Sequence, residues 1–241
     1  MKFYEFTKPD YLTDFEDMEN NPVKLLSNIA IPSIVCKVCG QWASSDRIRK
    51  DFVFSDVARK IIEKKVIPVE KWKQEISILA KELSIPYEIL TPSVKLGMPK
   101  GEVKKNILND FIHVFPGIIW IKAIDADKIK RKGFTGIKFV KVNIKYKKKN
   151  YDYNKDNELM EIVVTGKAWR KDSDIEKITV CNICGRTIFP NPNYISIDEK
   201  KWDKTDFFTL DCNPNRIFIT ERVYDYFKEN KFTNYRCIEI K

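Results

Sequence analysis

Cys36-Lys37-Val38-Cys39-Gly40 and Cys181-Asn182-Ile183-Cys184-Gly185 are the two stretches that decide how this chain is organised. In each stretch two residues separate the cysteines, a spacing that lets two thiolates bind one metal ion from a tight turn. The glycine that follows lets the backbone turn at low steric cost. Two such knuckles in one chain predict a single zinc ion held by Cys36, Cys39, Cys181 and Cys184.

Four thiolates fill the tetrahedral shell of Zn²⁺ and leave no position for a reactive water, so we expect a structural rather than a catalytic zinc ion. Two other interpretations of the motifs exist. A thioredoxin-like redox pair requires a lowered thiol pKa at a helix N-terminus inside a characteristic sheet, and buried thiols require no ligand at all. The paired spacing, with a glycine after each pair, favours zinc. Cys212 and Cys237 have no partner at ligand spacing, and we expect both to be buried free thiols.

The second half of the chain repeats a pattern found in the first. When the chain is slid by 98 residues, residues 118–122 fall on residues 216–220, and Phe134-Thr135 falls on Phe232-Thr233. Each segment has the pattern of strand, short helix, turn and strand, with apolar positions that coincide. A chance match between two unrelated units is the alternative. The pattern predicts an α+β fold of two related strand-helix-strand halves, joined at a zinc-ribbon-like centre formed by the two knuckles.

The polar connector at residues 150–157 marks the boundary between these halves. We expect residues 1–150 to form the first half and residues 151–241 the second, together as one compact unit. The first half is longer because of a helical insertion at about residues 52–105. Within this insertion, apolar residues at three- and four-residue spacings predict a helix over residues 69–83, bracketed by Pro68 and Pro86. These residues are Val69, Trp72, Ile76, Leu79, Ala80 and Leu83.

The composition is that of a globular protein: 43% of the 241 residues are hydrophobic and 12% are aromatic. The first residues lack the basic start and the apolar run of a signal peptide, and no apolar stretch reaches the roughly 18 residues that span a bilayer. We therefore expect a cytoplasmic protein with no membrane partner. The reducing cytosol favours metal ligands over disulfides for the cysteines.

The net charge of +10 includes two basic runs, at residues 128–132 and 145–149. Such runs could bind phosphate or an acidic partner, although they more commonly form a solvated face. Trp42, Trp169 and Trp202 could stack nucleic-acid bases beside these runs. We favour the alternative that they pack over a knuckle or fill a core.

No catalytic residue can be named from the sequence. His113 is the only histidine, and we expect it to be a hydrogen-bonded core or edge residue. Asp125 and Asp127 open a predicted helix, where aspartates are common. Gly97 and Gly101 are not followed by Lys-Ser or Lys-Thr, so they form no phosphate-binding loop. We expect the protein not to be an enzyme.

The two knuckles, with Arg186 after the second, and three C-terminal stretches resemble the double-CxxCG motif family of bacterial proteins. The stretches are Asp206-Phe207-Phe208, Ile219-Thr220-Glu221-Arg222 and Phe232-Thr233, and the resemblance covers nearly the whole chain. That family includes immunity proteins, which neutralise toxins delivered between competing bacteria. The resemblance implies a non-catalytic, zinc-stabilised binding protein whose partner is a cognate protein toxin.

The alternative function is that of a nucleic-acid-binding zinc-ribbon protein. The same knuckles occur in such proteins, and a chain with a net charge of +10 is attracted to a polyanion. The arrangement of the lysines distinguishes the two functions. A single stripe of lysines with exposed aromatic residues between them favours nucleic acid, whereas dispersed lysines favour a protein partner.

Overall fold

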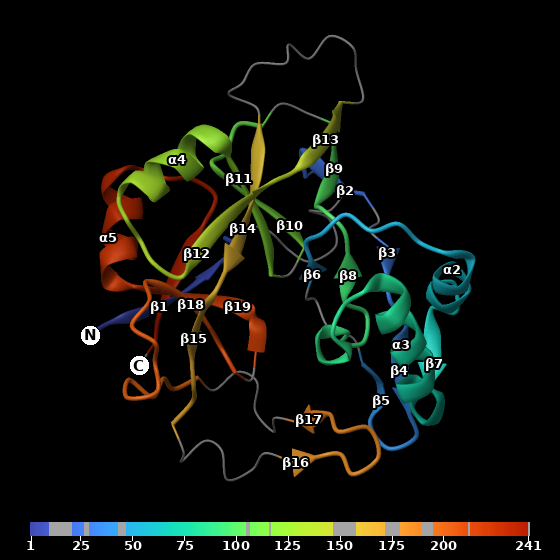
Figure 1. The fold of residues 1–241 in the computed structure, drawn as a ribbon. Helices are drawn as coiled ribbons and strands as arrows, with labels where there is room; N and C mark the ends of the chain where they lie inside the picture. The colour runs from blue at the N-terminus through green and yellow to red at the C-terminus, as the bar shows by residue number, and fades with distance from the viewer. Residues whose placement is uncertain are drawn as a thin grey trace. The chain divides into compact units, whose positions relative to one another are not determined.

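The computed structural model describes residues 1–9, 21–26, 29–42, 47–104, 107–115, 117–146, 158–171, 179–188, 195–211 and 213–240. The chain forms two compact units (Figure 1). Unit 1 consists of Met1–Leu26, Pro99–Lys177 and Asn191–Lys241, and unit 2 of Ser27–Met98 and Ile178–Pro190. Each unit therefore contains segments from both sides of the connector at residues 150–157. The fold is mixed α+β, as the sequence predicts.

Two sheets form the body of unit 1. The five-stranded sheet has the order β15-β18-β19-β1-β20, and the four-stranded sheet has the order β10-β11-β14-β12. A three-stranded sheet, β13-β9-β2, completes the unit. The strands of the first sheet are β1 (Phe3–Thr7), β15 (Gly166–Ala168), β18 (Phe207–Leu210), β19 (Asn213–Thr220) and β20 (Arg236–Ile240). Those of the second are β10 (Phe111–Phe115), β11 (Ile118–Lys122), β12 (Ile137–Lys141) and β14 (Leu159–Val164), and those of the third are β2 (Val23–Leu25), β9 (Lys100–Val103) and β13 (Asn143–Tyr146).

Two helices contribute apolar faces to the core that both large sheets share. The helix α4 (Ala123–Arg131) buries Ala126 and Ile129, and α5 (Glu221–Glu229) buries Val223 and Phe227. Residues three or four positions apart lie on one face of a helix, so each short helix presents one apolar stripe. The core contains Tyr4, Phe6, Phe111, Ile119, Ile121, Ala126, Ile129, Phe134, Ile162, Phe207, Ile217, Ile219, Val223, Phe227 and Phe232.

Tryptophans fill the outer faces of both large sheets. Trp120 is fully buried, and its indole nitrogen donates a 3.1 Å hydrogen bond to the carboxylate of Glu161. Trp202 is also buried, and its ring centroid lies 5.0 Å from that of Phe3 in an edge-to-face arrangement. The prediction that Trp202 fills a core is confirmed. Trp169 is 41% exposed, and the side chain of Trp42 lies outside the described part of the chain.

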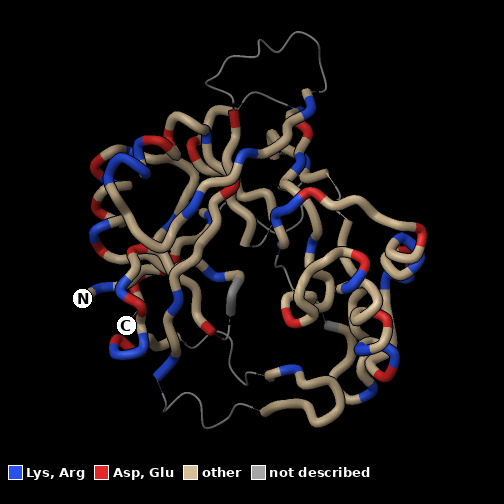
Figure 2. Tube along the Cα trace, viewed as in Figure 1, with Lys and Arg blue, Asp and Glu red and all other residues tan. Residues whose placement is uncertain are grey.

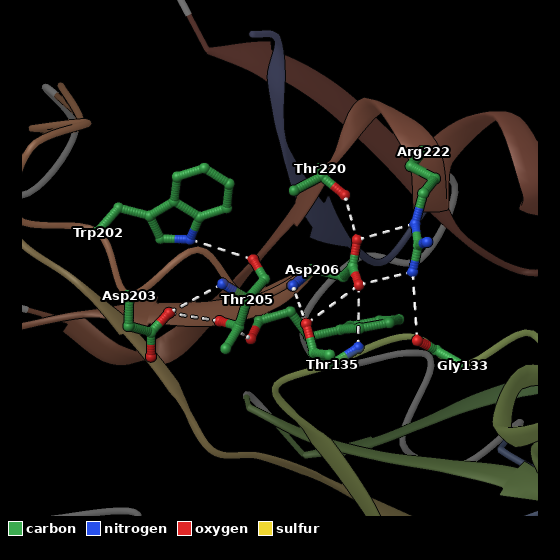
Figure 3. A network of polar contacts seen from close by, with 9 residues as sticks. Gly133, Thr135, Trp202, Asp203, Thr205, Asp206, Thr220 and Arg222 are labelled. Atoms are coloured by element: carbon green, nitrogen blue, oxygen red, sulfur yellow. Dashed lines mark hydrogen bonds and ion pairs between the residues drawn. The ribbon is translucent and has the colours of Figure 1, made fainter.

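Asp206 forms the centre of a polar junction (Figure 3). Its carboxylate accepts hydrogen bonds from the amide and hydroxyl of Thr135, at 2.9 and 3.1 Å, and from the hydroxyl of Thr220, at 3.1 Å. The guanidinium of Arg222 donates to both carboxylate oxygens and also to the carbonyl oxygen of Gly133. The residues quoted for the family resemblance thus connect β18, β19 and α5 to the turn before β12.

Unit 2 is built on one amphipathic helix. The helix α3 (Val69–Leu83) has the predicted bounds and buries Trp72, Ile76, Leu79, Ala80 and Leu83, which confirms the prediction. It follows β7 (Val66–Pro68) and packs with α2 (Asp56–Ile62) and the 3₁₀ turn η1 (Tyr87–Ile89). The remaining strands are β3 (Ile29–Ala30), β4 (Ser33–Cys36), β5 (Gly40–Trp42), β6 (Arg47–Ile48), β8 (Lys95–Leu96), β16 (Thr179–Val180) and β17 (Thr187–Ile188). Across the described residues, no helix combines the length and apolar character needed to cross a bilayer.

Candidate metal centre

The first knuckle is the turn of a hairpin. The strands β4 and β5 pair antiparallel, with Cys36 opposite Gly40. Gly40 has a φ of +70°, and a Cβ at this position would meet no atom within 4 Å. The left-handed backbone conformation, rather than lack of space, is therefore the reason for glycine. The strand β4 also pairs with β7, which places the knuckle on the core formed around α3.

The second knuckle repeats this geometry. The strands β16 and β17 pair antiparallel, and the turn between them is closed by hydrogen bonds from the Cys181 amide to the Arg186 carbonyl oxygen, at 2.9 Å, and from the Gly185 amide to the Cys181 carbonyl oxygen, at 2.8 Å. Gly185 has a φ of +71°, nearly that of Gly40. Two sequence motifs with the same spacing thus form two turns that each place a glycine in the left-handed conformation.

The four cysteines meet within unit 2. The sulfur atoms of Cys36 and Cys181 are 3.9 Å apart, and those of Cys39 and Cys184 are 3.2 Å apart. All four sulfur atoms lie within 4.8 Å of one another. A tetrahedron with Zn–S bonds of about 2.3 Å has edges of about 3.8 Å, so these separations fit one tetrahedral ion after small shifts of the side chains. Cys36 and Cys181 are buried, and the other two are partly buried.

Backbone amides prepare two of the four sulfurs to carry negative charge. Hydrogen bonds from the amides of Cys39 and Val38 lower the pKa of Cys36. The amides of Cys184 and Ile183 act in the same way on Cys181, whose pKa falls to about 6. Amides that point at a sulfur favour the thiolate, which is the form that binds metal.

The pKa of Cys39 is shifted in the opposite direction. The side-chain hydrogen bond between Cys39 and Cys184 raises the pKa of Cys39 to about 12, and burial acts in the same direction. Four adjacent thiols cannot all ionise without a cation between them. A divalent ion would replace the thiol protons, so the four sulfurs form a group of potential metal ligands.

Cationic side chains lie at the knuckles, where four thiolates around a zinc ion would have a net charge of −2. Arg186 donates a 3.4 Å hydrogen bond from its guanidinium to the carbonyl oxygen of Cys39, which connects the second knuckle to the first. The spacing of the two motifs does not predict this contact. Lys37 is exposed, and its ammonium lies 3.8 Å from the carboxylate of Glu70.

The second hairpin buries few side chains of its own. Thr179, Val180, Thr187 and Ile188, which form its two strands, are all exposed. Apolar burial therefore contributes little to holding this hairpin in unit 2. A metal ion bound to all four cysteines would supply the missing attachment, because it joins the hairpin to a knuckle that is already anchored on a core.

The remaining candidate residues lie outside this cluster. His113 is in β10 of unit 1, and Asp125 and Asp127 in α4 form ion pairs with Lys128 and Lys130. Cys237 is a partly buried thiol whose pKa is raised to about 12 by burial, and Cys212 lies outside the described residues. Among the described residues, neither His113, Cys237 nor the two aspartates join the four sulfurs in the cluster of potential ligands.

No protein-family model matches this chain, and a comparison with curated proteins also finds no match.

Proposed function

We propose that the protein is a non-catalytic, zinc-stabilised binding protein, and that its partner is a cognate bacterial toxin that it neutralises by stoichiometric binding. The observation that carries the proposal is the closed group of four cysteine sulfurs from two knuckles. In this proposal Cys36, Cys39, Cys181 and Cys184 bind one Zn²⁺ in a zinc-ribbon-like centre. The ion acts as a structural link, because four protein ligands leave no coordination position for a substrate.

The likeness to the double-CxxCG family supports a toxin as the partner. The residues that carry this likeness include Asp206, Arg222 and Thr233, and all three make structural contacts within unit 1. They are therefore residues of the scaffold rather than of a toxin-binding surface. We expect the toxin to bind exposed residues outside this group.

The distribution of charge favours a protein partner over nucleic acid. Lys and Arg are interspersed with Asp and Glu along both units (Figure 2). In the basic run at residues 128–132, Lys128 and Lys130 form ion pairs with Asp125 and Asp127 at 2.8 and 2.9 Å. In the other run, Lys145 lies in β13, and residues 147–149 lie outside the described part of the chain.

The tryptophans point to the same conclusion. Nucleic-acid binding of single strands uses aromatic rings exposed along a basic groove. Trp72, Trp120 and Trp202 are buried, and Trp169 is 41% exposed. A nucleic-acid-binding zinc-ribbon protein is the second candidate function, supported by the net charge of +10.

Metal analysis of the purified protein tests the zinc centre. We expect about one zinc ion per chain, and loss of that ion in Cys181→Ser. Cys237→Ser serves as the matched control, because Cys237 lies outside the cluster and this variant should keep its zinc. Full zinc content and an unchanged melting temperature in Cys181→Ser would show that the cluster is not a metal centre.

Co-expression with the toxin encoded by the neighbouring gene tests the function. We expect protection of the cell and recovery of a 1:1 complex of the two proteins that nuclease treatment leaves intact. If the association depends on electrostatic attraction to this basic chain, added salt should slow it. Recovery of nucleic acid or ribosomes that nuclease abolishes, without protection, would favour the second candidate function.

A further inference from the structure

Four neighbouring strands of the five-stranded sheet, β18-β19-β1-β20, correspond in order to the four-stranded sheet β10-β11-β14-β12, yet each set contains a strand from the other half of the sequence. In one sheet, β14 lies between β11 and β12 and pairs antiparallel with both. In the other, β1 lies between β19 and β20 and pairs antiparallel with both. Figure 1 shows the blue N-terminal strand β1 beside the orange and red strands of the C-terminal half. Along the chain, β1 precedes the first knuckle and β14 precedes the second.

The registers of these strands are equivalent. Glu5 of β1 lies opposite Phe218 of β19, and Glu161 of β14 lies opposite Trp120 of β11. The shift of 98 residues that aligns the two halves places Trp120 on Phe218. The same shift of 98 residues also aligns the pairing of β1 with β20 and the pairing of β14 with β12. Since one residue of slippage would turn every side chain to the other face, this agreement is a specific structural match.

An ion pair recurs at equivalent positions with its charges exchanged. The ammonium of Lys2, just before β1, lies 3.4 Å from the carboxylate of Glu239 in β20. Just before β14, the carboxylate of Glu158 lies 2.9 Å from the ammonium of Lys141 in β12. Lys141 and Glu239 are again 98 residues apart. These pairs are exposed and contribute little energy, but they mark the same place in both sheets.

Two equivalent pairs of an aspartate and a threonine also join the halves by hydrogen bonds. The carboxylate of Asp206 accepts from the amide and hydroxyl of Thr135 (Figure 3), and that of Asp110 accepts from the amide and hydroxyl of Thr233, both at 2.8 Å. In both cases the amide of the aspartate donates back to the threonine hydroxyl, at 3.1 and 3.0 Å. Each aspartate directly precedes a strand of one half, β10 or β18, and its carboxylate binds the turn of the other half.

We propose that this chain is a fused dimer of two copies of one structural motif. The two copies exchange their first strands. One copy consists of β1, the first knuckle, β10, β11, α4 and β12, and the other of β14, the second knuckle, β18, β19, α5 and β20. Each copy lacks the strand between its last two strands, and the other copy supplies it. The knuckles are also shared between the copies, because each copy contributes one knuckle to unit 2. This inference does not depend on the partner of the protein.

The exchange means that main-chain hydrogen bonds, rather than the connector, hold the halves together. In the described part of the chain, four strand pairs join residues of the first copy to residues of the second: β1 with β19, β1 with β20, β14 with β11, and β14 with β12. To separate the copies, a central strand must leave each sheet, and the backbone groups of its neighbours must lose their partners.

Cutting the connector in the full-length protein tests the proposal. A site for a sequence-specific protease replaces residues 150–157, and the purified protein is cleaved in native buffer. We expect the two fragments to elute together as one species with the mass of the uncut chain. A carbodiimide, which joins a lysine to an adjacent carboxylate as an amide, should then link the fragments through Lys2 to Glu239 and through Lys141 to Glu158. Glu239→Gln and Glu158→Gln should each remove one of these links and leave the other.

Separation of the fragments at micromolar concentration in native buffer would overturn the proposal. A link between Lys141 and Glu158 without one between Lys2 and Glu239 would also overturn it, because β1 would then not lie in the sheet of the second copy. The uncut variant should have the melting temperature of the parent chain. If the replaced connector disturbs folding, the two cross-links can be mapped in the unmodified protein instead. The presence of both links supports the proposal, and the absence of the link between Lys2 and Glu239 overturns it.

Discussion

The imidazole of His113 is held against the backbone of a turn: its Nε2 atom lies 2.9 Å from the carbonyl oxygen of Asn234. The side-chain amide of Asn234 in turn donates a 2.7 Å hydrogen bond to the carbonyl oxygen of Phe111. Burial lowers the pKa of His113 to about 4, although its hydrogen bond to Asn234 opposes this shift. His113 is therefore a hydrogen-bonded neutral residue, as expected from the sequence.

This environment predicts a loss of stability in mild acid. Below a pH of about 6.5 the unfolded chain gains a proton at His113 that the folded chain accepts only near pH 4. Stability should therefore fall as the pH drops through this window, by about 2 kcal/mol at pH 5 relative to pH 7. Urea unfolding of the parent and of His113→Gln measures the effect, because other acid-sensitive groups are common to both proteins. An imidazole that titrates near pH 6.5 by NMR would contradict the prediction, and the single histidine makes its signals easy to assign.

Gly101 is required by the close approach of Trp120. A Cβ at position 101 would lie 2.5 Å from two ring carbons of Trp120, which is fully buried and hydrogen-bonded to Glu161. We expect Gly101→Ala to lower the free energy of unfolding by about 1–3 kcal/mol, since the ring has no room to move. In a Trp120→Leu background the same substitution should cost much less. Equal costs in the two backgrounds, measured by denaturant unfolding, would exclude this contact as the cause.

The two reciprocal junctions differ in strength. Asp206 binds Arg222 as well as Thr135, whereas the position equivalent to Arg222 in the first half is Ile124, which is 49% exposed. We expect Asp206→Ala to cost about 2–3 kcal/mol, because Thr135, Thr220 and the Arg222 guanidinium all lose the carboxylate as an acceptor. Asp110→Ala should cost about 1 kcal/mol, because it removes the bonds to Thr233 alone. Denaturant unfolding in which Asp110→Ala is the more damaging variant would contradict this ranking.

The sequence predicted the features that depend on local spacing. The helix at residues 69–83 follows from its apolar periodicity, and the four cysteines follow from the two-residue gaps. The placement of β1 between β19 and β20 could not be predicted in this way, because a strand pattern fixes which face is buried but not which distant strand is its neighbour. The contact of Arg186 with Cys39 could not be predicted for the same reason, because it joins residues 147 positions apart.

Removal of the proposed metal ion should act locally, on the second knuckle. The hairpin of β16 and β17 has exposed strands, so without the ion little apolar burial holds it in unit 2. Chelation should therefore speed amide hydrogen exchange at residues 179–188, while β18 and β19 keep their protection, because these strands pair within the large sheet of unit 1. Cys184→Ser should reproduce this pattern without the chelator. Uniform loss of protection across both units would show instead that the metal controls global folding, and unchanged exchange at the hairpin would show that contacts other than the metal secure it.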